Sequence, residues 1–220
     1  MDIVITNVQE IIPYYLVFEI FYYISNKLDI FYDFNHAYFL MHFIVNLINT
    51  ILLLPFIGHL IYDPLGNNII KSDWQNLDII YPMINGLHTF HLIHHLKKIN
   101  PDEIFHHCVT HIFWYIIQIA KNPVYISGII TMSGIPGGIT YLMLFLQKYN
   151  ILNKNTEKKI SMYLNIWIRE PICIIYATII YIIGLSNGLY YETLFMAIFT
   201  IINGVHFMHN IIESYYNKVN

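Results

Sequence analysis

Two adjacent histidines, His106 and His107, open a long uncharged stretch and are the residues of this chain best suited to chemistry. They follow the acidic residues Asp102 and Glu103, and the next charged side chain is Lys121. A neutral imidazole can accept a proton, attack an acyl group or bind a metal ion. Ionisable side chains within apolar segments are costly, so the pair favours a functional role.

The twelve histidines of the chain are unevenly distributed, and nine of them fall in three groups. At about 100° per residue, His88, His91 and His95 share one helical face, whereas His94 points elsewhere. His111 lies one helical turn after His107, on the same face. We therefore expect a second set of residues to line a cavity beside the pair, and it comprises His88, His91, His95, His111 and Arg169.

The other histidines have simpler interpretations. We expect the singly placed His36, His42 and His59 to be structural or interfacial, and His206 and His209 to make helix contacts. The series His91-x-x-His94-His95 also matches the HxxHH boxes of membrane di-iron desaturases and hydroxylases, since imidazole suits iron. Those enzymes use three such boxes, and the other two candidate groups here have different spacing. No metal site is predicted, and a metal-dependent hydroxylase or desaturase stays open as an alternative.

Arg169 is the only arginine and stands beside Glu170 and Pro171. In a span that begins near Ile160 it would lie about 13–15 Å deep, at about 1.5 Å per residue. A charge at that depth requires a partner or an aqueous cavity. Arg169 is therefore either an anion site for a phosphate or carboxylate, or a side chain that extends back to the lysine-rich membrane face.

The composition indicates a membrane protein. The 220 residues are 56% hydrophobic and 11% charged, whereas a soluble domain carries about 25% charged residues. Residues 37–62, 122–147 and 171–191 lack any charged side chain, and each run reaches the roughly 20 residues of a spanning helix. Strands of a β-barrel would be shorter and would alternate apolar with polar residues. We predict an all-α polytopic membrane protein with six or seven transmembrane helices.

Lysine placement orients these spans. The first candidate span is the weakest because it contains Glu10, Pro13 and Glu19. With all seven spans, one side receives eight lysines and the other receives Lys71 and Lys121. The positive-inside rule then places the N-terminus in the lumen and the C-terminus in the cytosol, in the endoplasmic reticulum or another internal membrane. The candidate spans are 9–25, 37–62, 76–96, 104–120, 123–146, 161–184 and 191–212.

Several classes of function are disfavoured. No secretory signal is recognisable at the acidic N-terminus. Cys108 and Cys173 stand in apolar segments and form no disulfide framework or redox motif. The net charge of −3 and the absence of a basic tract argue against nucleic acid. The expected partners are membrane lipids, and a homodimer is left open.

Glycines and a proline interrupt the fifth candidate span in the run Met132-Ser133-Gly134-Ile135-Pro136-Gly137-Gly138. Such residues at membrane depth permit a kink or a close approach between helices. We interpret the run as a packing feature, with the lining of a substrate cavity as the alternative.

The stretch from Asp102 to Thr110 resembles the histidine-pair region of the TLC-domain family, which includes the ceramide synthases. The family motif has an acidic approach and then HHxxT at the start of a span, and His106, His107 and Thr110 match it. Asn203 resembles a late polar position of the family. Ceramide synthases carry acidic partners downstream, where this chain has Met132 and Ser133, so the resemblance is to the broader TLC-domain branch. It implies an N-terminal membrane-associated segment, 1–35, and a TLC-like helical bundle, 36–215.

The resemblance also implies a chemistry. In the acyltransferase branch a histidine of the pair takes an acyl group from acyl-CoA, and an amine or another acceptor then attacks it. We therefore expect an acyltransferase-like enzyme of lipid metabolism, with His106 and His107 as the catalytic pair. Acyl-CoA would be a co-substrate, and no cofactor is expected. A non-catalytic protein that binds lipids or regulates their composition remains an alternative.

Overall fold

All regular structure in the described part of the chain is helical. The computed structural model describes residues 2–31, 33–62, 79–96, 101–120, 123–129 and 134–219. No strand occurs among these residues, which agrees with the predicted all-α class. The elements are α1 (Asp2–Lys27), α2 (Phe34–Tyr62), α4 (Ile80–His95), α5 (Pro101–Ala120), α6 (Pro123–Ile129), α7 (Ile135–Lys148), α8 (Lys154–Leu164), the π-helical turn η2 (Asn165–Arg169), α9 (Glu170–Asn187) and α10 (Tyr190–Val219).

Three helical runs are long and apolar enough to cross a membrane. They are Phe34–Leu54, Lys154–Asn187 and Tyr190–Asn217. The membrane class is thereby supported, whereas the count of about seven spans is not confirmed. The second run includes α8, whose charged residues fall between the predicted fifth and sixth spans. Its helix begins early because the Asn153 side chain caps it by accepting a hydrogen bond from the N–H of Asn155.

The predicted fifth span, 123–146, is not one continuous helix among the described residues. It comprises the short helix α6 and the fourteen-residue helix α7. Residues 130–133, which include Met132 and Ser133, lie outside the described residues. Pro136 stands within the first two positions of α7, where a missing N–H costs no helical hydrogen bond. Helix α7 therefore begins within the Gly-Pro run.

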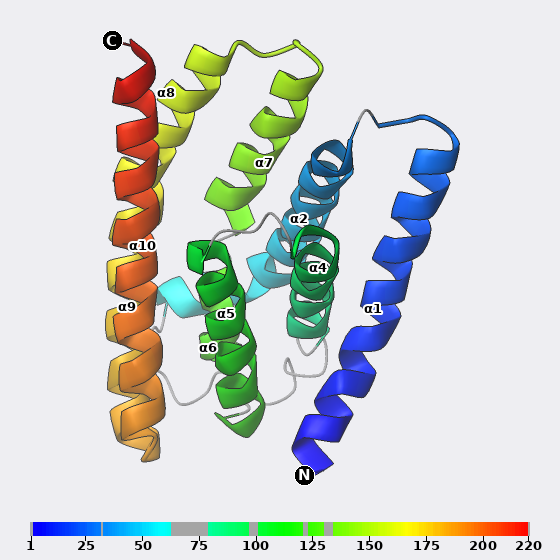
Figure 1. Ribbon diagram of the computed structural model, residues 1–220. Helices are drawn as coiled ribbons and strands as arrows, with labels where there is room; N and C mark the ends of the chain where they lie inside the picture. Colours follow the sequence, from blue (N-terminus) through cyan, green and yellow to red (C-terminus); the bar gives the residue numbers. More distant parts are fainter. Residues whose placement is uncertain are drawn as a thin grey trace.

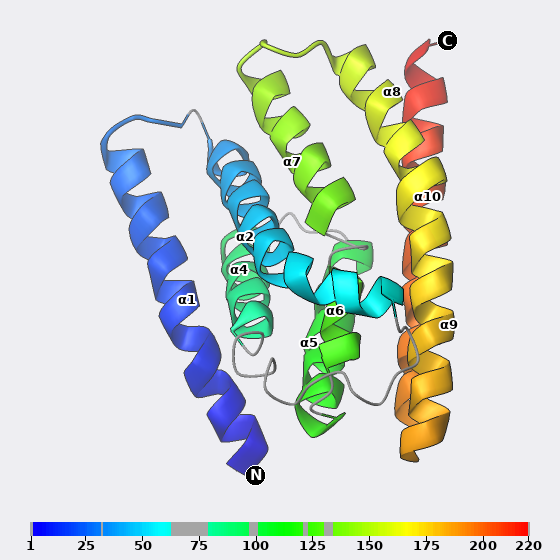
Figure 2. The ribbon, with the colours of Figure 1, turned by 180° about the vertical axis from the view of Figure 1, so that it is seen from behind.

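The helices form an elongated bundle with the two termini at opposite ends (Figure 1). Helix α1 packs along α4, and α2 packs against α7. The continuous run of α8, η2 and α9 lies beside α10, which contacts all three. Seen from behind, α7 lies between α2 and the α8–α10 pair (Figure 2).

The outward surface is unusually apolar. Exposed large apolar side chains occur along the helices that form the outside of the bundle, including Leu16 and Val17 on α1, Ile51 on α2 and Ile175 on α9. Contiguous apolar surface of this kind is rare on soluble monomers and marks contact with a membrane or a partner. The outer surface therefore agrees with the membrane class derived from the helix lengths.

Helix α1 is fixed to the bundle by aromatic packing and one polar contact. Phe18 and Tyr22 pack against Phe90 of α4 with ring centroids 6.4 and 5.9 Å apart. The carboxylate Oε1 of Glu19 lies 2.8 Å from Nε2 of His94. The weakest predicted span is thus a helix packed on α4, and Glu19 has a partner within the protein.

A polar clamp joins the start of α2 to the end of α7. Asp33 accepts a hydrogen bond from the N–H of His36 at 2.9 Å and pairs with Nζ of Lys148 at 3.3 Å. Partial burial alone would raise the pKa of Asp33, but the His36 N–H and the Lys148 ammonium together outweigh it and lower the pKa below its ordinary value. Asp33 is therefore ionised at neutral pH and holds together two helices that line the site.

Candidate functional site

A cavity of about 530 Å³ lies among α2, α4, α5, α7, η2 and α10. Its volume is within the range of roughly 300–1,000 Å³ that small-molecule sites occupy. Much of its wall is apolar, as at Phe39, Leu87, Phe113 and Leu144. The wall also carries six imidazoles, one guanidinium and one carboxylate beside asparagine, threonine and tyrosine side chains; these ionisable groups belong to His42, His88, His91, His95, His106, His107, Arg169 and Glu103.

The cavity brings together six of the seven residues expected in the site. His88, His91, His95, His106, His107 and Arg169 all line it, although they come from three separate segments of the chain. His111 is partly buried one turn beyond His107 and is not among the lining residues. These placements give the predicted residues a common location and leave their roles to be inferred from geometry.

His106 is held by a residue that is distant in sequence. Its Nδ1 lies 3.0 Å from Oδ1 of Asn203 on α10, and Thr110 donates a hydrogen bond to its main-chain carbonyl at 2.9 Å. Because an amide oxygen only accepts, Nδ1 carries the proton and Nε2 keeps its lone pair. An oriented imidazole with a free lone pair can act as a nucleophile or a general base.

His107 faces a different partner from His106. Its Nε2 lies 3.1 Å from Nδ1 of His91, whose ring stacks on Tyr38 with centroids 4.1 Å apart. Nδ1 of His107 is buried and has no hydrogen-bond partner among the described residues. The two histidines of the pair thus have separate contacts, as adjacent residues on a helix must.

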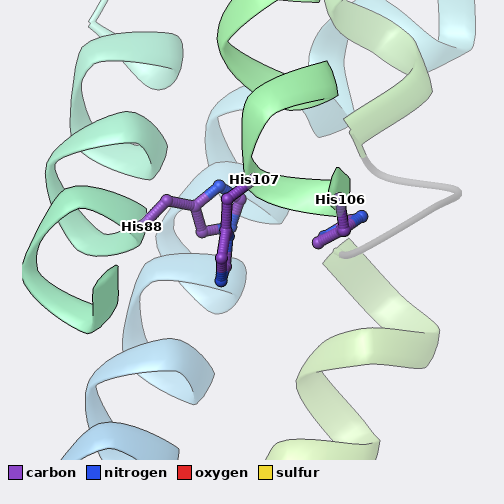
Figure 3. A group of neighbouring side chains, drawn as sticks. All are labelled: His88, His106 and His107. Atoms are coloured by element: carbon purple, nitrogen blue, oxygen red, sulfur yellow. The ribbon is translucent and has the colours of Figure 1, made fainter. Parts of the chain in front are cut away.

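His88 completes a compact cluster with the pair (Figure 3). One ring nitrogen from each of His88, His106 and His107 lies within 4.8 Å of the others. The His88 ring, from α4, is 4.4 Å from the His107 ring between centroids, and its buried Nδ1 has no hydrogen-bond partner in the described part of the chain. Three neutral imidazoles at this separation are also a ligand set that suits zinc or iron.

The HxxHH series does not form a common ligand set. His94 turns to Glu19 on α1, while His91 contacts His107 in the cavity. His95 stacks on Phe34 with ring centroids 4.7 Å apart. His91 and His95 therefore share the cavity wall, with ring centroids 5.2 Å apart, whereas His94 contacts Glu19, and the three histidines form no common ligand set among the described residues.

The remaining histidines are mostly outside the cavity wall. His206 lies 2.9 Å from the amide nitrogen of Asn210 on its own helix, and His209 is exposed. His36 is buried beside Tyr149. The side chain of His59 lies outside the described residues. The buried place of His36 fits a structural role, whereas the helix contacts expected of His206 and His209 stay a prediction.

His42 differs from its expected structural or interfacial place, because it lines the cavity. Its ring stacks on Tyr141 with centroids 3.9 Å apart and lies 5.9 Å from that of His88. The sequence carries a signal for this placement. His42, Asn46 and Asn49 recur at helical spacing in an otherwise apolar span, and all three are buried.

Comparison with known proteins finds none that is similar to this chain. No family model, no curated protein and no solved structure matches the chain. The case for function consequently rests on the cavity and on the residues that line it.

Proposed function

We propose that this protein is a polytopic membrane enzyme that transfers an acyl group from a thioester to a lipid acceptor, with His106 as the nucleophile. The observation that carries the proposal is the contact between His106 Nδ1 and Asn203 Oδ1. It leaves Nε2 of His106 unprotonated at the wall of a largely apolar cavity. An acyl chain fits such a cavity, and a neutral imidazole is the form that attacks.

The proposed reaction has two steps. Nε2 of His106 attacks the thioester carbonyl, the carbon–sulfur bond breaks, and an acyl-imidazolium that keeps its proton on Nδ1 forms together with a thiolate. The hydroxyl or amine of the acceptor then attacks the acyl carbon, and the bond to Nε2 breaks. The acceptor proton passes to Nδ1 of His107 and leaves on the thiolate, so that the products are an ester or amide and a free thiol.

The proposed setting is an internal membrane such as the endoplasmic reticulum. Six or seven spans, with the lysine-rich ends in the cytosol, would place His106 near the cytosolic end of its helix. A water-soluble acyl-CoA could then reach the site from the cytosol, and the lipid acceptor from the membrane. The match of His106, His107, Thr110 and Asn203 to the TLC-domain pattern supports this assignment, because the structure joins two of these distant positions by a contact.

Whole-lipid mass spectrometry tests the proposal. Cells would express the wild type, the double variant His106→Ala/His107→Ala, or the control His209→Ala, which removes an exposed histidine of the same protein. We expect a lipid product with the wild type and the control that is lost with the double variant at equal protein level. An identical lipid profile for all three variants, in cells supplied with a range of acyl donors and acceptors, would contradict the proposal.

A metal-dependent lipid hydroxylase or hydrolase is the second candidate, and the cluster of His88, His106 and His107 favours it specifically. Under the acyl-transfer proposal, protein purified without chelators contains no stoichiometric zinc or iron and keeps its activity in chelator. Elemental analysis of the wild type beside His88→Ala measures this. One metal ion per chain that disappears in His88→Ala, while His209→Ala retains it, would support the second candidate and contradict the first.

A further inference from the structure

Arg169 lies in a distorted turn within a long helix. The N–H of Glu170 bonds to the carbonyl of Asn165, five residues back, which defines the π turn η2. Pro171 follows directly and cannot donate a helical hydrogen bond, so the preceding turn loses regularity. Single π turns within α-helices occur frequently at functional sites. Here the turn ends at the only arginine of the chain, whose side chain lines the cavity.

The guanidinium of Arg169 is positioned but not neutralised. It lies over the ring of Phe207 at 4.6 Å, and Nη1 donates to Oδ1 of Asn165 at 3.4 Å. Its Nε is buried and has no hydrogen-bond partner among the described residues. No ion pair with a carboxylate forms at Arg169 within the described residues. A cation enclosed in apolar surroundings requires a counter-anion or water.

The adjacent carboxyl group does not fill this role. Glu170 packs its side chain against Gly204 of α10, where a Cβ would collide with the carboxyl oxygen. Oε2 of Glu170 is buried, and no hydrogen-bond partner for it lies in the part of the chain that the structure describes. Arg169 and Glu170 therefore diverge, as neighbours on a helix do, and the guanidinium keeps most of its donors for a ligand.

A series of hydrogen bonds along the same helical run, from Glu157 to Asn165, positions the Arg169 side chain. Ser161 donates to Glu157 at 2.9 Å, and the amide nitrogen of Asn165 donates to the carbonyl of Ser161 at 2.8 Å. With its nitrogen engaged, Asn165 presents its oxygen to Arg169. This series of hydrogen bonds orients the guanidinium before any ligand arrives, which lowers the entropic cost of binding.

The arginine and the proposed nucleophile face the same space. The Phe207 ring contacts the Arg169 guanidinium on one side and lies 5.4 Å from the His106 ring between centroids. Phe207 is also one helical turn from Asn203, the partner of His106. A ligand group bound at Arg169 would thus lie in the cavity beside the reacting imidazole.

We infer that Arg169 binds a phosphate oxyanion of the ligand that occupies the cavity. A guanidinium pairs with such a group through two parallel N–H donors, which an ammonium cannot match. This inference rests on the acyl-transfer proposal, to which it adds the class of substrate. Binding of the anion at Arg169 can nevertheless occur without acyl transfer. Two sources share the chemistry: the phosphates of a soluble acyl-CoA and the phosphate of an anionic phospholipid.

Binding measured in a maltoside detergent, which carries no phosphate, tests the inference. The probes are palmitoyl-CoA, phosphatidic acid and, as a neutral reference, diacylglycerol. Arg169→Gln removes the positive charge, and Arg169→Lys keeps the charge but lacks the two parallel N–H donors. The control Lys159→Gln removes an exposed cation from the same helical run. We expect at least one anionic probe to bind the wild type and Lys159→Gln equally. Its affinity should fall roughly 10- to 100-fold in Arg169→Gln and less in Arg169→Lys.

The outcomes separate the alternatives. Loss of palmitoyl-CoA binding alone assigns the site to the soluble donor, and loss of phosphatidic acid binding alone assigns it to the lipid. The inference is overturned if both anionic probes bind the wild type, a folded Arg169→Lys and a folded Arg169→Gln with equal affinity. It is also overturned if neither anionic probe binds the wild type. His106→Ala should keep the anion affinity. A wild-type protein that shows Arg169-dependent binding but no acyl transfer would refute acyl transfer and leave the anion site in place.

Discussion

Replacing His106 by alanine is expected to lower the rate of acyl transfer by at least about 10³-fold, because the variant lacks the group that forms the covalent intermediate. No other imidazole of the cavity has the same arrangement. Nε2 of His107 is engaged with His91, whereas Nε2 of His106 is left free by the contact of Nδ1 with Asn203. The measurement is the turnover of purified protein with a labelled acyl-CoA and the lipid acceptor that the lipid analysis identifies.

The same protein allows the intermediate to be observed. A brief exposure to acyl-CoA without acceptor should add one acyl mass to the wild type and to His209→Ala, and none to His106→Ala. Thermal unfolding of the variants shows whether a loss reflects misfolding. A folded His106→Ala that keeps more than about a tenth of the wild-type rate would exclude a nucleophilic role, since such losses exceed about 10²-fold even for proton transfer alone.

The sequence predicts those helices that are governed by local patterning. The uncharged runs 37–62 and 171–191 correspond to parts of α2 and α9 because their lengths and compositions leave no other stable arrangement at membrane depth. The start of α8 was missed, since hydropathy alone does not distinguish a charged helical turn from a loop. The cap at Asn153 supplies the missing signal.

The site was predictable to the extent that it depends on helical faces. The common face of His88, His91 and His95 and the divergence of His94 follow from the helical period, and the structure has the first three at the cavity and His94 on Glu19. The inclusion of His42 depends on how α2 packs against α4 and α7, which is a tertiary property. The helical spacing of His42 with Asn46 and Asn49 indicates a buried polar face on α2 but not that this face meets the cavity.

The contacts that give the residues distinct chemistry are also tertiary. The contact of His106 with Asn203 joins positions 97 residues apart, and that of His107 with His91 joins different helices. No periodicity specifies which nitrogen of an imidazole is left free. The sequence could therefore propose the pair but not divide the roles within it, and the structure provides the basis for assigning the nucleophile to His106.

Asn203 is the residue on which that division depends, and Asn203→Leu is expected to lower kcat about 10²-fold with little change in KM. Leucine is similar in volume but cannot accept the hydrogen bond, so the His106 ring is free to rotate and to exchange its proton between nitrogens. Positioning residues of this kind act on the oriented nucleophile and not on substrate affinity. The measurement is steady-state kinetics of the purified variant, with the acyl adduct formed more slowly but still on His106.

A conservative variant distinguishes positioning from packing. Asn203→Asp restores an acceptor oxygen for Nδ1 and should recover most of kcat, whereas Asn203→Ala, which removes both the acceptor and the volume, should behave like Asn203→Leu. Asn210→Leu, on an exposed part of the same helix, is the matched control and should retain the wild-type rate. If Asn203→Leu folds and retains the wild-type kcat, the contact does not orient His106, and the nucleophile must be sought among the other imidazoles of the cavity.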